Sequence, residues 1–223
     1  MANKANVYID GFNLYRGRLK DTPFRWLDLG ALCTALFPEL TINRIRYFTA
    51  VVTAYGHDPD APTRQDVYLR ALATIPNLTL HKEGWFASYP VLLPLYPLVH
   101  PQGLSQKPKC VLVLKNEEKR TDVDLATYLL MDCFVGDFDE AVVISNDADL
   151  VLPIETVKTT FGKRVGVVNP HRKKKVSGHL ARAASYHRKS IKNKTLGACQ
   201  FPDPVIDATG RQIAKPPSWN APP

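Results

Sequence analysis

Acidic residues recur in this sequence just after short apolar segments, where a carboxylate can reach a bound ion or substrate. Asp10 ends the apolar run of NVYIDGFNLYRGRL, and Asp122 follows the apolar segment CVLVLK and a polar connector. Asp147 and Asp149 follow the segment AVVIS in the stretch SNDADL. The carboxyl ends of parallel strands meet at one edge of a sheet, and ligands bind there. We therefore expect all four carboxylates at one edge of a sheet.

Each acid also has a simpler explanation, because Asp is favoured at helix N-termini, where its side chain accepts backbone N–H bonds. For any single acid, helix capping is the favoured interpretation, and Thr121 and Asp124 even resemble a capping box. Several carboxylates together are different, because they repel one another and raise each other's pKa unless a cation is present. Oxygen donors without a neighbouring His or Cys suit Mg²⁺ or Mn²⁺. The set therefore predicts a Mg²⁺ or Mn²⁺ site.

Helical spacing separates two of the candidates. Asp122 lies one turn before Ala126 and shares the apolar side of its helix, whereas Asp124, two residues later, does not. We therefore expect Asp124 to be a cap or a solvent-exposed residue. Spacing does not decide between Asp147 and Asp149, because both can lie in the loop before the next helix.

Apolar strand-like runs alternate with helical patterns along the chain. This alternation predicts an α/β protein with a Rossmann-like, three-layer α/β/α fold and a mostly parallel central sheet. The five prolines of 90–108 predict a loop, and the Pro-rich stretch after Gln200 predicts an extended C-terminal tail. We expect strands at 6–9, 42–52, 78–89, 110–115, 141–145 and 164–169, and helices at 26–37, 63–75, 121–134 and 150–161.

The net charge of +8 is unevenly distributed. Residues 171–223 carry a net charge of +9, and residues 1–170 carry −1. We therefore expect a near-neutral domain at 1–170 and a basic extension at 171–223 that packs on it or wraps around it through Phe201 and Trp219. A basic segment suits a polyanionic partner, nucleic acid first, although a solvated surface explains the charge equally well.

Other classes of protein are disfavoured. No run approaches eighteen apolar residues, so we expect no membrane span, and the N-terminal residues lack the apolar core of a signal peptide. The four cysteines are widely spaced, which predicts reduced thiols in a cytoplasmic protein and neither disulfides nor a zinc site.

Three motifs resemble those of bacterial NYN domain proteins, a branch of the PIN-like (FLAP nuclease-like) superfamily. They are YIDGFNLY, EKRTDVDLATYLL and FDEAVVISNDADLVLPIETVKTTFGKRVGVVNP, and the similarity extends into the tail of one long subgroup through KPPSW. The resemblance implies a PIN-like fold and a metal-dependent ribonuclease that hydrolyses RNA. Arg120 stands where this family often has Gly, and Asp124 where it often has Asn.

The resemblance also implies roles for individual residues. Asp10, Asp122, Asp147 and Asp149 match the acidic, metal-binding and catalytic positions, with Asp10 and Asp147 as direct ligands of Mg²⁺ or Mn²⁺. Asn13 matches the motif Asn that would orient a phosphate or an Asp10 oxygen. Ser145 and Asn146 match polar positions beside the third acidic motif and are expected to bind substrate. Arg16, from the first helix and not from the resemblance, is a further substrate-binding candidate near this edge, with a solvated arginine as the favoured alternative.

Three alternatives stay open. PIN-like relatives include flap nucleases, so the substrate could be single-stranded or branched DNA. The chain could also be a non-catalytic RNA-binding module that keeps its acids for structure. A homodimer is a further open expectation. A phosphatase of the haloacid dehalogenase type is disfavoured, because Phe12 occupies the position where that chemistry needs a second Asp.

Overall fold

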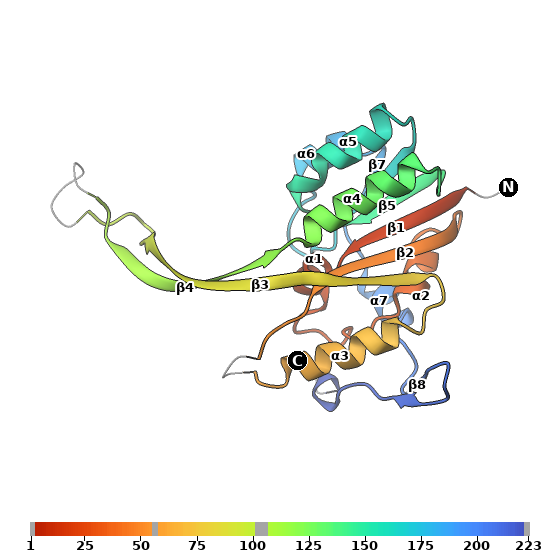
Figure 1. Ribbon diagram of the computed structural model, residues 1–223, viewed down its shortest axis with the longest axis horizontal. Helices are drawn as coiled ribbons and strands as arrows, with labels where there is room; N and C mark the ends of the chain where they lie inside the picture. The colour runs from red at the N-terminus through yellow and green to blue at the C-terminus, as the bar shows by residue number, and fades with distance from the viewer. Residues whose placement is uncertain (1–2, 55–57, 101–106, 221–223) are drawn as a thin grey trace.

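A seven-stranded sheet forms the centre of the protein in the computed structural model, which describes residues 3–54, 58–100 and 107–220 (Figure 1). The strand order is β4-β3-β2-β1-β5-β6-β7. All neighbouring strands are parallel except β3 and β4, which are antiparallel. The strands are β1 (Lys4–Asp10), β2 (Thr41–Ala50), β3 (Leu78–Pro94), β4 (Cys110–Lys119), β5 (Glu140–Ile144), β6 (Arg164–Val168) and β7 (Tyr186–Arg188).

Helices cover both faces of this sheet. Because successive strand residues point to opposite faces, Val7 and Ile9 pack on the layer of α2 and α3, whereas Tyr8 packs on the layer of α4 and α5. The predicted three-layer α/β/α fold with a mostly parallel sheet is confirmed. No helix among the described residues is long and apolar enough to cross a bilayer. The helices are α1 (Gly11–Leu14), η1 (Tyr15–Leu19), α2 (Leu29–Leu36), α3 (Ala61–Leu72), α4 (Thr121–Phe134), η2 (Ala148–Leu150), α5 (Val151–Thr159), α6 (Gly178–Ala183) and α7 (Asn193–Ala198).

One predicted loop is a strand instead. The loop expected over 90–108 is wrong for residues 90–94, which continue β3, and residues 101–106 lie outside the described part. Residues 110–115 form the expected strand, but most of its side chains are exposed and not buried. Pro90 and Pro94 are tolerated because this half of β3 pairs on one side only, with β4. Residues 85–94 and 110–119 thus form a two-stranded ribbon, the β3–β4 arm, which projects from the body (Figure 1).

The chain after residue 170 adds to the body. It supplies strand β7 to the central sheet, followed by α7 and the small hairpin of β8 (Val205–Ile206) and β9 (Gln212–Ile213). Phe201 packs on Trp26, with ring centroids 5.7 Å apart. Trp219, in the last short helix η3 (Pro217–Trp219), packs on the same Trp26 ring, with centroids 6.2 Å apart. The tail is therefore held by aromatic packing. The domain division at residue 170 stays a prediction.

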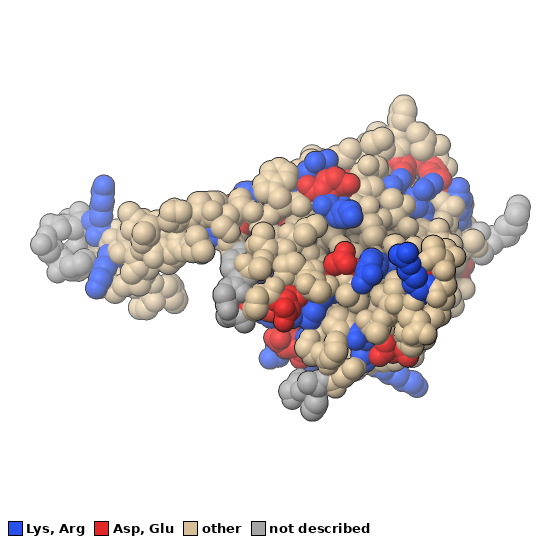
Figure 2. Space-filling view, turned by 60° about the horizontal axis from the view of Figure 1, so that its bottom comes forward, with Lys and Arg blue, Asp and Glu red and all other residues tan. Residues whose placement is uncertain are grey.

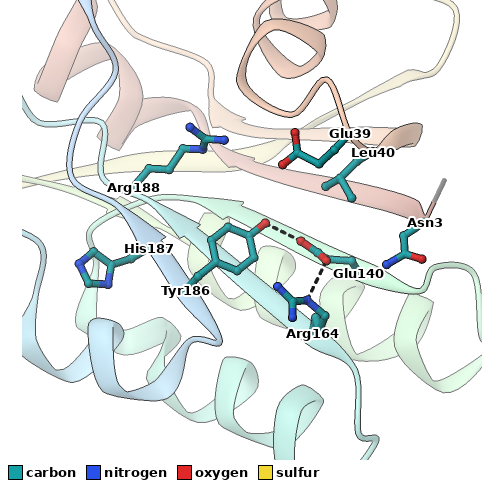
Figure 3. A pocket seen from close by; sticks show the side chains of 8 residues that line it. All are labelled: Asn3, Glu39, Leu40, Glu140, Arg164, Tyr186, His187 and Arg188. Atoms are coloured by element: carbon teal, nitrogen blue, oxygen red, sulfur yellow. Dashed lines mark hydrogen bonds and ion pairs between the residues drawn. The ribbon is translucent and has the colours of Figure 1, made fainter.

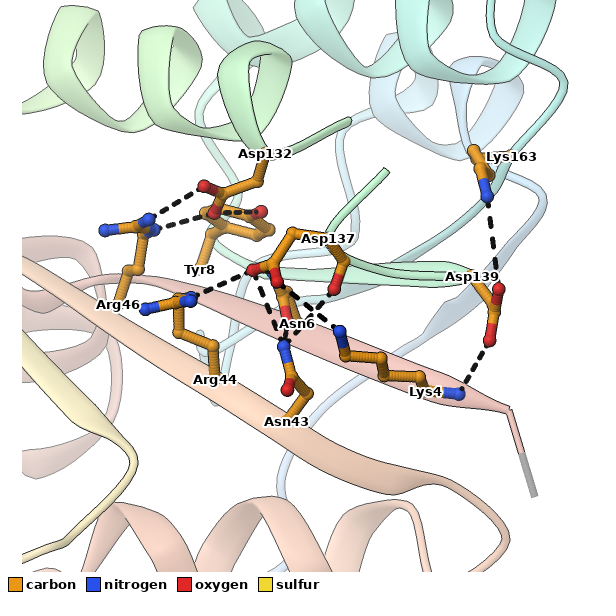
Figure 4. Close-up of polar contacts among 10 residues, drawn as sticks. All are labelled: Lys4, Asn6, Tyr8, Asn43, Arg44, Arg46, Asp132, Asp137, Asp139 and Lys163. Carbon is orange, nitrogen blue, oxygen red and sulfur yellow. Dashed lines mark hydrogen bonds and ion pairs between the residues drawn. The ribbon is translucent and has the colours of Figure 1, made fainter. Parts of the chain in front are cut away.

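A buried polar cluster fastens α4 to the sheet (Figure 4). Asp132 accepts hydrogen bonds from the Tyr8 hydroxyl at 2.8 Å and from Arg46 Nε and Nη2, both at 2.7 Å. This bidentate pair fixes the orientation of α4 on β1 and β2. The N-terminal end of α4, with Asp122, is thereby directed toward the carboxyl ends of the parallel strands.

Candidate functional site

Asp10 is the most buried acid at the carboxyl edge of the sheet, with 6% of its surface exposed. Its Oδ1 accepts the Asn13 N–H at 2.9 Å, and its Oδ2 accepts the Ser145 hydroxyl at 2.9 Å. Gly11 is required beside it, because a Cβ there would lie 2.7 Å from the Phe48 carbonyl oxygen. The Asp-Gly junction therefore turns the chain tightly and fixes the carboxylate between β1 and the end of β5.

The loop after β5 brings two further acids, Asp147 and Asp149, to the same edge. Asp147 Oδ1 accepts the Asp149 N–H at 3.1 Å, and the Asp147 N–H donates to Ser145 Oγ at 3.1 Å. Ser145 therefore links Asp10 to Asp147 through one hydroxyl. Asp10 and Asp147 do cap α1 and η2, as the simpler interpretation of single acids expected. Asp149 is exposed, whereas Asp147 is half-buried.

The carboxylates influence one another electrostatically. Burial raises the pKa of Asp10 to about 7, the charges of Asp122 and Asp147 add to the rise, and the bonds from Asn13 and Ser145 oppose it. Burial also raises the pKa of Asp122, and Asp147 and Asp149 raise it further. The four predicted acids are thus close enough to disfavour each other's charge, which is the condition that a cation relieves.

A fifth carboxylate, Glu118, joins the four that the sequence indicated. Burial raises its pKa to about 7, with further contributions from Asp10 and Asp122, while a bond from Thr121 and the charge of Arg16 lower it. Its Oε1 is buried and has no hydrogen-bond partner among the described residues. A buried carboxylate oxygen without a partner is costly, so Glu118 is available for a ligand that the protein does not itself supply.

Sequence reasoning missed Glu118 because it treated residues 116–120 as a connector. In the structure β4 runs on to Lys119, and Glu118 lies opposite Phe86 on the face of the arm that meets the body. Alternation from the apolar run of 110–115 would have placed Glu118 on the face shared by Leu112 and Leu114. Continuing the period-two pattern by three residues was the available signal.

The predicted substrate-binding residues have mixed environments. The Asn13 side chain accepts the Asn146 N–H at 3.2 Å, so it braces the loop, and its backbone N–H meets Asp10. The Asn146 side chain is engaged by Ser177 N–H and the Lys175 carbonyl, which ties the acidic loop to the basic segment. The Arg16 guanidinium is exposed and lies 4.2 Å from the Phe12 ring centroid.

Arg120 and Asp124, the two departures from the family pattern, contact each other at the start of α4. Arg120 has a φ of 82°, in the left-handed region that favours Gly, at the junction between β4 and α4. Its side chain pairs with Asp124 at 3.0 Å. Asp124 is therefore engaged by Arg120, in agreement with the helical spacing that separated it from Asp122.

The donor set fits a hard divalent cation in its chemistry. All candidate donors are carboxylate oxygens, three of them have raised pKa values, and one oxygen of Glu118 lacks a partner. Within the described ranges, no three His, Cys, Asp or Glu side chains are already converged on a common point as ligands. Asp122, Asp147 and Glu118 would therefore adjust their rotamers around the fixed Asp10 carboxylate.

A cavity of about 360 Å³ opens at the base of the β3–β4 arm, lined by Gly11 and Phe12, the residues that follow Asp10; none of the five carboxylates is part of its lining. Its size is in the range of small-molecule or nucleotide sites. Phe12 and Phe86 form one wall, with ring centroids 5.1 Å apart, and Arg16 lies beside them. Aromatic faces with a neighbouring arginine suit a planar, negatively charged ligand such as a nucleotide.

A second cavity, of about 710 Å³, lies at the amino ends of β5 and β6 (Figure 3). Its buried acid, Glu140, is already satisfied by the Tyr186 hydroxyl and by Arg164 Nε at 3.1 Å. It lies at the edge of the sheet opposite to Asp10, so we assign its polar groups a structural role.

Comparisons with known proteins bear on the family and on the fold. The family model described as NYN domain matches residues 4–191. The chain is also 28% identical, over 97% of its own length and 75% of the other protein, to 6-hydroxy-3-succinoylpyridine 3-monooxygenase HspA of Pseudomonas putida (strain DSM 28022 / S16). A crystal structure of a protein of unknown function from Vibrio parahaemolyticus matches with a TM-score of 0.51 and 15% identity, covering 86% of this chain and 94% of that one. This last similarity concerns the fold alone.

Proposed function

The chain belongs to the NYN domain family, a nuclease-type family, and from this membership we propose that it is a metal-dependent ribonuclease. We propose that it hydrolyses RNA phosphodiester bonds with Mg²⁺ or Mn²⁺ at the carboxyl edge of the sheet.

Cys33, Cys133 and Cys199 are buried free thiols, and Cys110 is an exposed one. This supports our proposal of a cytoplasmic location, because thiols stay reduced there.

The observation that carries this proposal is Asp10. It is a nearly fully buried carboxylate whose pKa is raised to about 7, and the acids Asp122, Asp147 and Glu118 face it from other elements. Groups with strongly shifted pKa values that share a cleft mark functional sites. Asp10 also caps α1, but the cap uses only Oδ1 and leaves the buried charge uncompensated, since Asp10 takes part in no ion pair among the described residues.

The chain's own residues would bind the metal and orient the RNA. Asp10, Asp122 and Asp147 would hold the ion, with Glu118 and Asp149 completing the set. When bound, Mg²⁺ or Mn²⁺ neutralises charge on the scissile phosphate and lowers the pKa of the attacking water. Phe12, Phe86 and Arg16 would hold a neighbouring base in the cavity. The basic residues after His171 would attract the phosphate backbone.

The proposal is tested with end-labelled RNA and DNA oligonucleotides of the same sequence, single-stranded and flapped, in Mn²⁺, Mg²⁺ or EDTA. We expect cleavage of RNA that EDTA abolishes. Preferential cleavage of DNA would contradict the ribonuclease proposal and favour the flap-nuclease alternative. RNA binding without cleavage, unchanged by Asp122→Asn, would favour the non-catalytic module.

Glu118→Gln tests the fifth carboxylate. Because Gln cannot supply a negative charge, we expect the Mn²⁺ concentration for half-maximal cleavage to rise roughly tenfold, the lower end of the 10–100-fold cost of losing a supporting group. Glu117→Gln is the matched control, since Glu117 pairs with Lys119 at 2.7 Å on the other face of β4. Equal behaviour of the two variants in a Mn²⁺ titration would remove Glu118 from the site.

The basic segment gives a salt-dependence prediction. Lys174 and Lys175 lie beside the acidic loop, because Asn146 binds the Lys175 carbonyl at 3.1 Å. In Lys174→Ala/Lys175→Ala we expect the slope of log affinity against log salt to become shallower by about 1.4, two phosphate contacts at ~0.7 each. Lys4→Ala/Lys163→Ala removes the same charge at the opposite edge and should leave the slope unchanged. Fluorescence anisotropy with a labelled RNA measures it.

A second candidate function is the oxygenation of a small aromatic acid. It is favoured by the 28% identity to a protein named as a monooxygenase of 6-hydroxy-3-succinoylpyridine, and by a cavity whose volume and aromatic lining suit such a ligand. Oxygen uptake with this compound and a reduced nicotinamide cofactor distinguishes the two. We expect no compound-dependent uptake, and a clear uptake that persists without RNA would favour the oxygenase.

A further inference from the structure

The outer half of the β3–β4 arm exposes its apolar side chains. Leu92, Leu112 and Leu114 are 65%, 68% and 64% exposed. An isolated two-stranded ribbon is at best marginally stable in water, and contiguous exposed apolar surface marks an interaction site. The further exposed apolar residues of the arm and its end are Tyr89, Leu93, Tyr96, Leu98, Val99 and Val111.

These leucines share one face of the arm. Leu92 lies opposite Leu112, and Pro90 lies opposite Leu114, so the four side chains form a cross-strand block. The paired charged residues of β4 are confined to the base of the arm, at 115–119. Figure 2 likewise shows the arm as mostly uncharged surface with a few basic side chains, among them those next to its grey outer end, while most Lys, Arg, Asp and Glu lie on the body. The outer arm therefore fits an apolar partner surface and not a polyanion.

The outer side of α4 exposes a second apolar surface. Val123, Met131, Phe134 and Val135 are all exposed, whereas Leu129 on the opposite side is fully buried. Spacings of eight and eleven residues put Val123, Met131 and Phe134 on one side of the helix. We call these four residues the α4 stripe. Nothing among the described residues covers it.

We propose that the arm of one copy docks on the α4 stripe of a second copy, and that the second copy reciprocates, which gives a two-fold symmetric dimer. The surfaces match in length. Five residues of each arm strand span about 17 Å, and the thirteen-residue stripe spans about 18 Å. In a two-fold dimer the contact between arm and stripe occurs twice, once in each direction. A chain that carries both surfaces can therefore form a closed dimer with a second copy and needs no other partner.

The available area is sufficient for a stable dimer. With full areas of about 150–250 Å² for a large apolar side chain, the exposures of Leu92, Leu112 and Leu114 on the docking face amount to roughly 350 Å² per copy and those of the stripe to roughly 500 Å². A standard interface buries about 800 Å² on each partner. The docking face of the arm and the stripe together reach this area, so a second copy is the occupant that both surfaces support. This dimer is independent of the proposed ribonuclease activity.

Light scattering after size exclusion, at about 20 μM protein, tests the assembly. We expect the wild-type mass to be twice 24.9 kDa. Leu92→Lys/Leu112→Glu replaces an apolar cross-strand pair by a pair of opposite charge. The arm should therefore stay folded while its apolar face is lost. This variant and Met131→Glu/Phe134→Lys should both be monomeric with unchanged circular dichroism. The control Ile206→Lys, an exposed apolar position elsewhere, should remain dimeric.

Mixing the two monomeric variants identifies which surfaces meet. A mixed pair retains one of the two arm-on-stripe contacts, so it should form a heterodimer that is weaker than the wild-type dimer, although neither variant pairs with itself. If the α4 variant stays dimeric, the arm does not dock on α4. If the wild-type chain is monomeric, or monomeric but bound to anionic phospholipid vesicles, the proposal is overturned.

Cross-linking provides an independent readout, because Cys110 is exposed on the Leu92 face of the arm and the other three cysteines are buried. In dilute protein, a short bismaleimide should join Cys110 to Val123→Cys or Val135→Cys of the second copy. Ala35→Cys, exposed on α2 in the opposite layer, is the control. If neither position gives more covalent dimer than this control, the docking is contradicted.

Discussion

Asp10→Asn is expected to reduce RNA cleavage in Mn²⁺ by more than about a hundredfold, because loss of even an indirect partner of a metal site costs about 10–100-fold. The substitution nearly preserves shape, so Asn13 N–H and Ser145 Oγ keep partners at the same positions. The loss should therefore fall on metal-dependent cleavage and not on folding. Initial rates with a labelled RNA at saturating Mn²⁺ measure it.

The same substitution should have the opposite effect on stability without metal. The folded-state pKa of Asp10, about 7, lies above the ordinary value of 3.8, so the folded protein binds the proton more tightly than the unfolded chain. The free energy of unfolding of the wild type in EDTA should therefore fall as pH rises from about 4 to 7, by a few kcal/mol. Asp10→Asn cannot ionise and should be the more stable protein at pH 8. Mn²⁺ should then stabilise only the wild type.

Asp124→Asn is the matched control for Asp10→Asn. It makes the same chemical change two residues after Asp122 on α4, on a residue that pairs with Arg120. Its cleavage rate and its response to Mn²⁺ should stay within about threefold of the wild type, as for an exposed ion pair of small energetic weight. If Asp10→Asn cleaves as fast as Asp124→Asn, the catalytic assignment of Asp10 is wrong.

Asp132→Ala is expected to destabilise the protein by about 3 kcal/mol, because it leaves the buried Arg46 guanidinium without its bidentate partner. Arg46 and Asp132 side chains are only 11% and 8% exposed, and Tyr8 loses its acceptor as well. Denaturant unfolding followed by circular dichroism measures the loss. Because this pair fixes α4, which carries Asp122, cleavage per folded molecule should also fall.

Asp66→Ala provides the comparison for Asp132→Ala. Asp66 pairs with Arg70 along α3, with side chains 69% and 58% exposed, so its loss should cost less than about 1 kcal/mol. A cost for Asp132→Ala as small as that for Asp66→Ala would show that the Arg46 pair does not hold α4 in place.

The position of the acids could be predicted because it follows from topology. Asp10 ends β1 and Asp147 follows β5, the adjacent parallel strand, and such strands present their carboxyl ends at one edge. Helical spacing likewise separated Asp122 from Asp124. These predictions needed only local patterns and the rule of parallel connection, so the sequence was sufficient for them.

The arm and Glu118 could not be predicted in the same way. Prolines at 90 and 94 argue against a strand, unless one side of that strand is unpaired, and only the sheet order shows that it is. Glu118 pairs with Phe86, inside the expected strand 78–89, but the polar run NEEKR at 116–120 is typical of a connector and gives no apolar alternation that extends β4 to Glu118. The environment of Asn146 depends on the segment around Lys175, about thirty residues away, and local patterns do not contain such contacts.

Anomalous diffraction from crystals soaked in Mn²⁺ tests the central claim most directly, namely that the acids at the carboxyl edge hold a divalent cation. We predict an anomalous peak in contact with the carboxylates of Asp10 and Asp147 in the wild type, and its loss in Asp10→Asn. Ordered side chains at Asp10, Asp122 and Asp147 with no peak between them, at a Mn²⁺ concentration that saturates cleavage, would contradict the account.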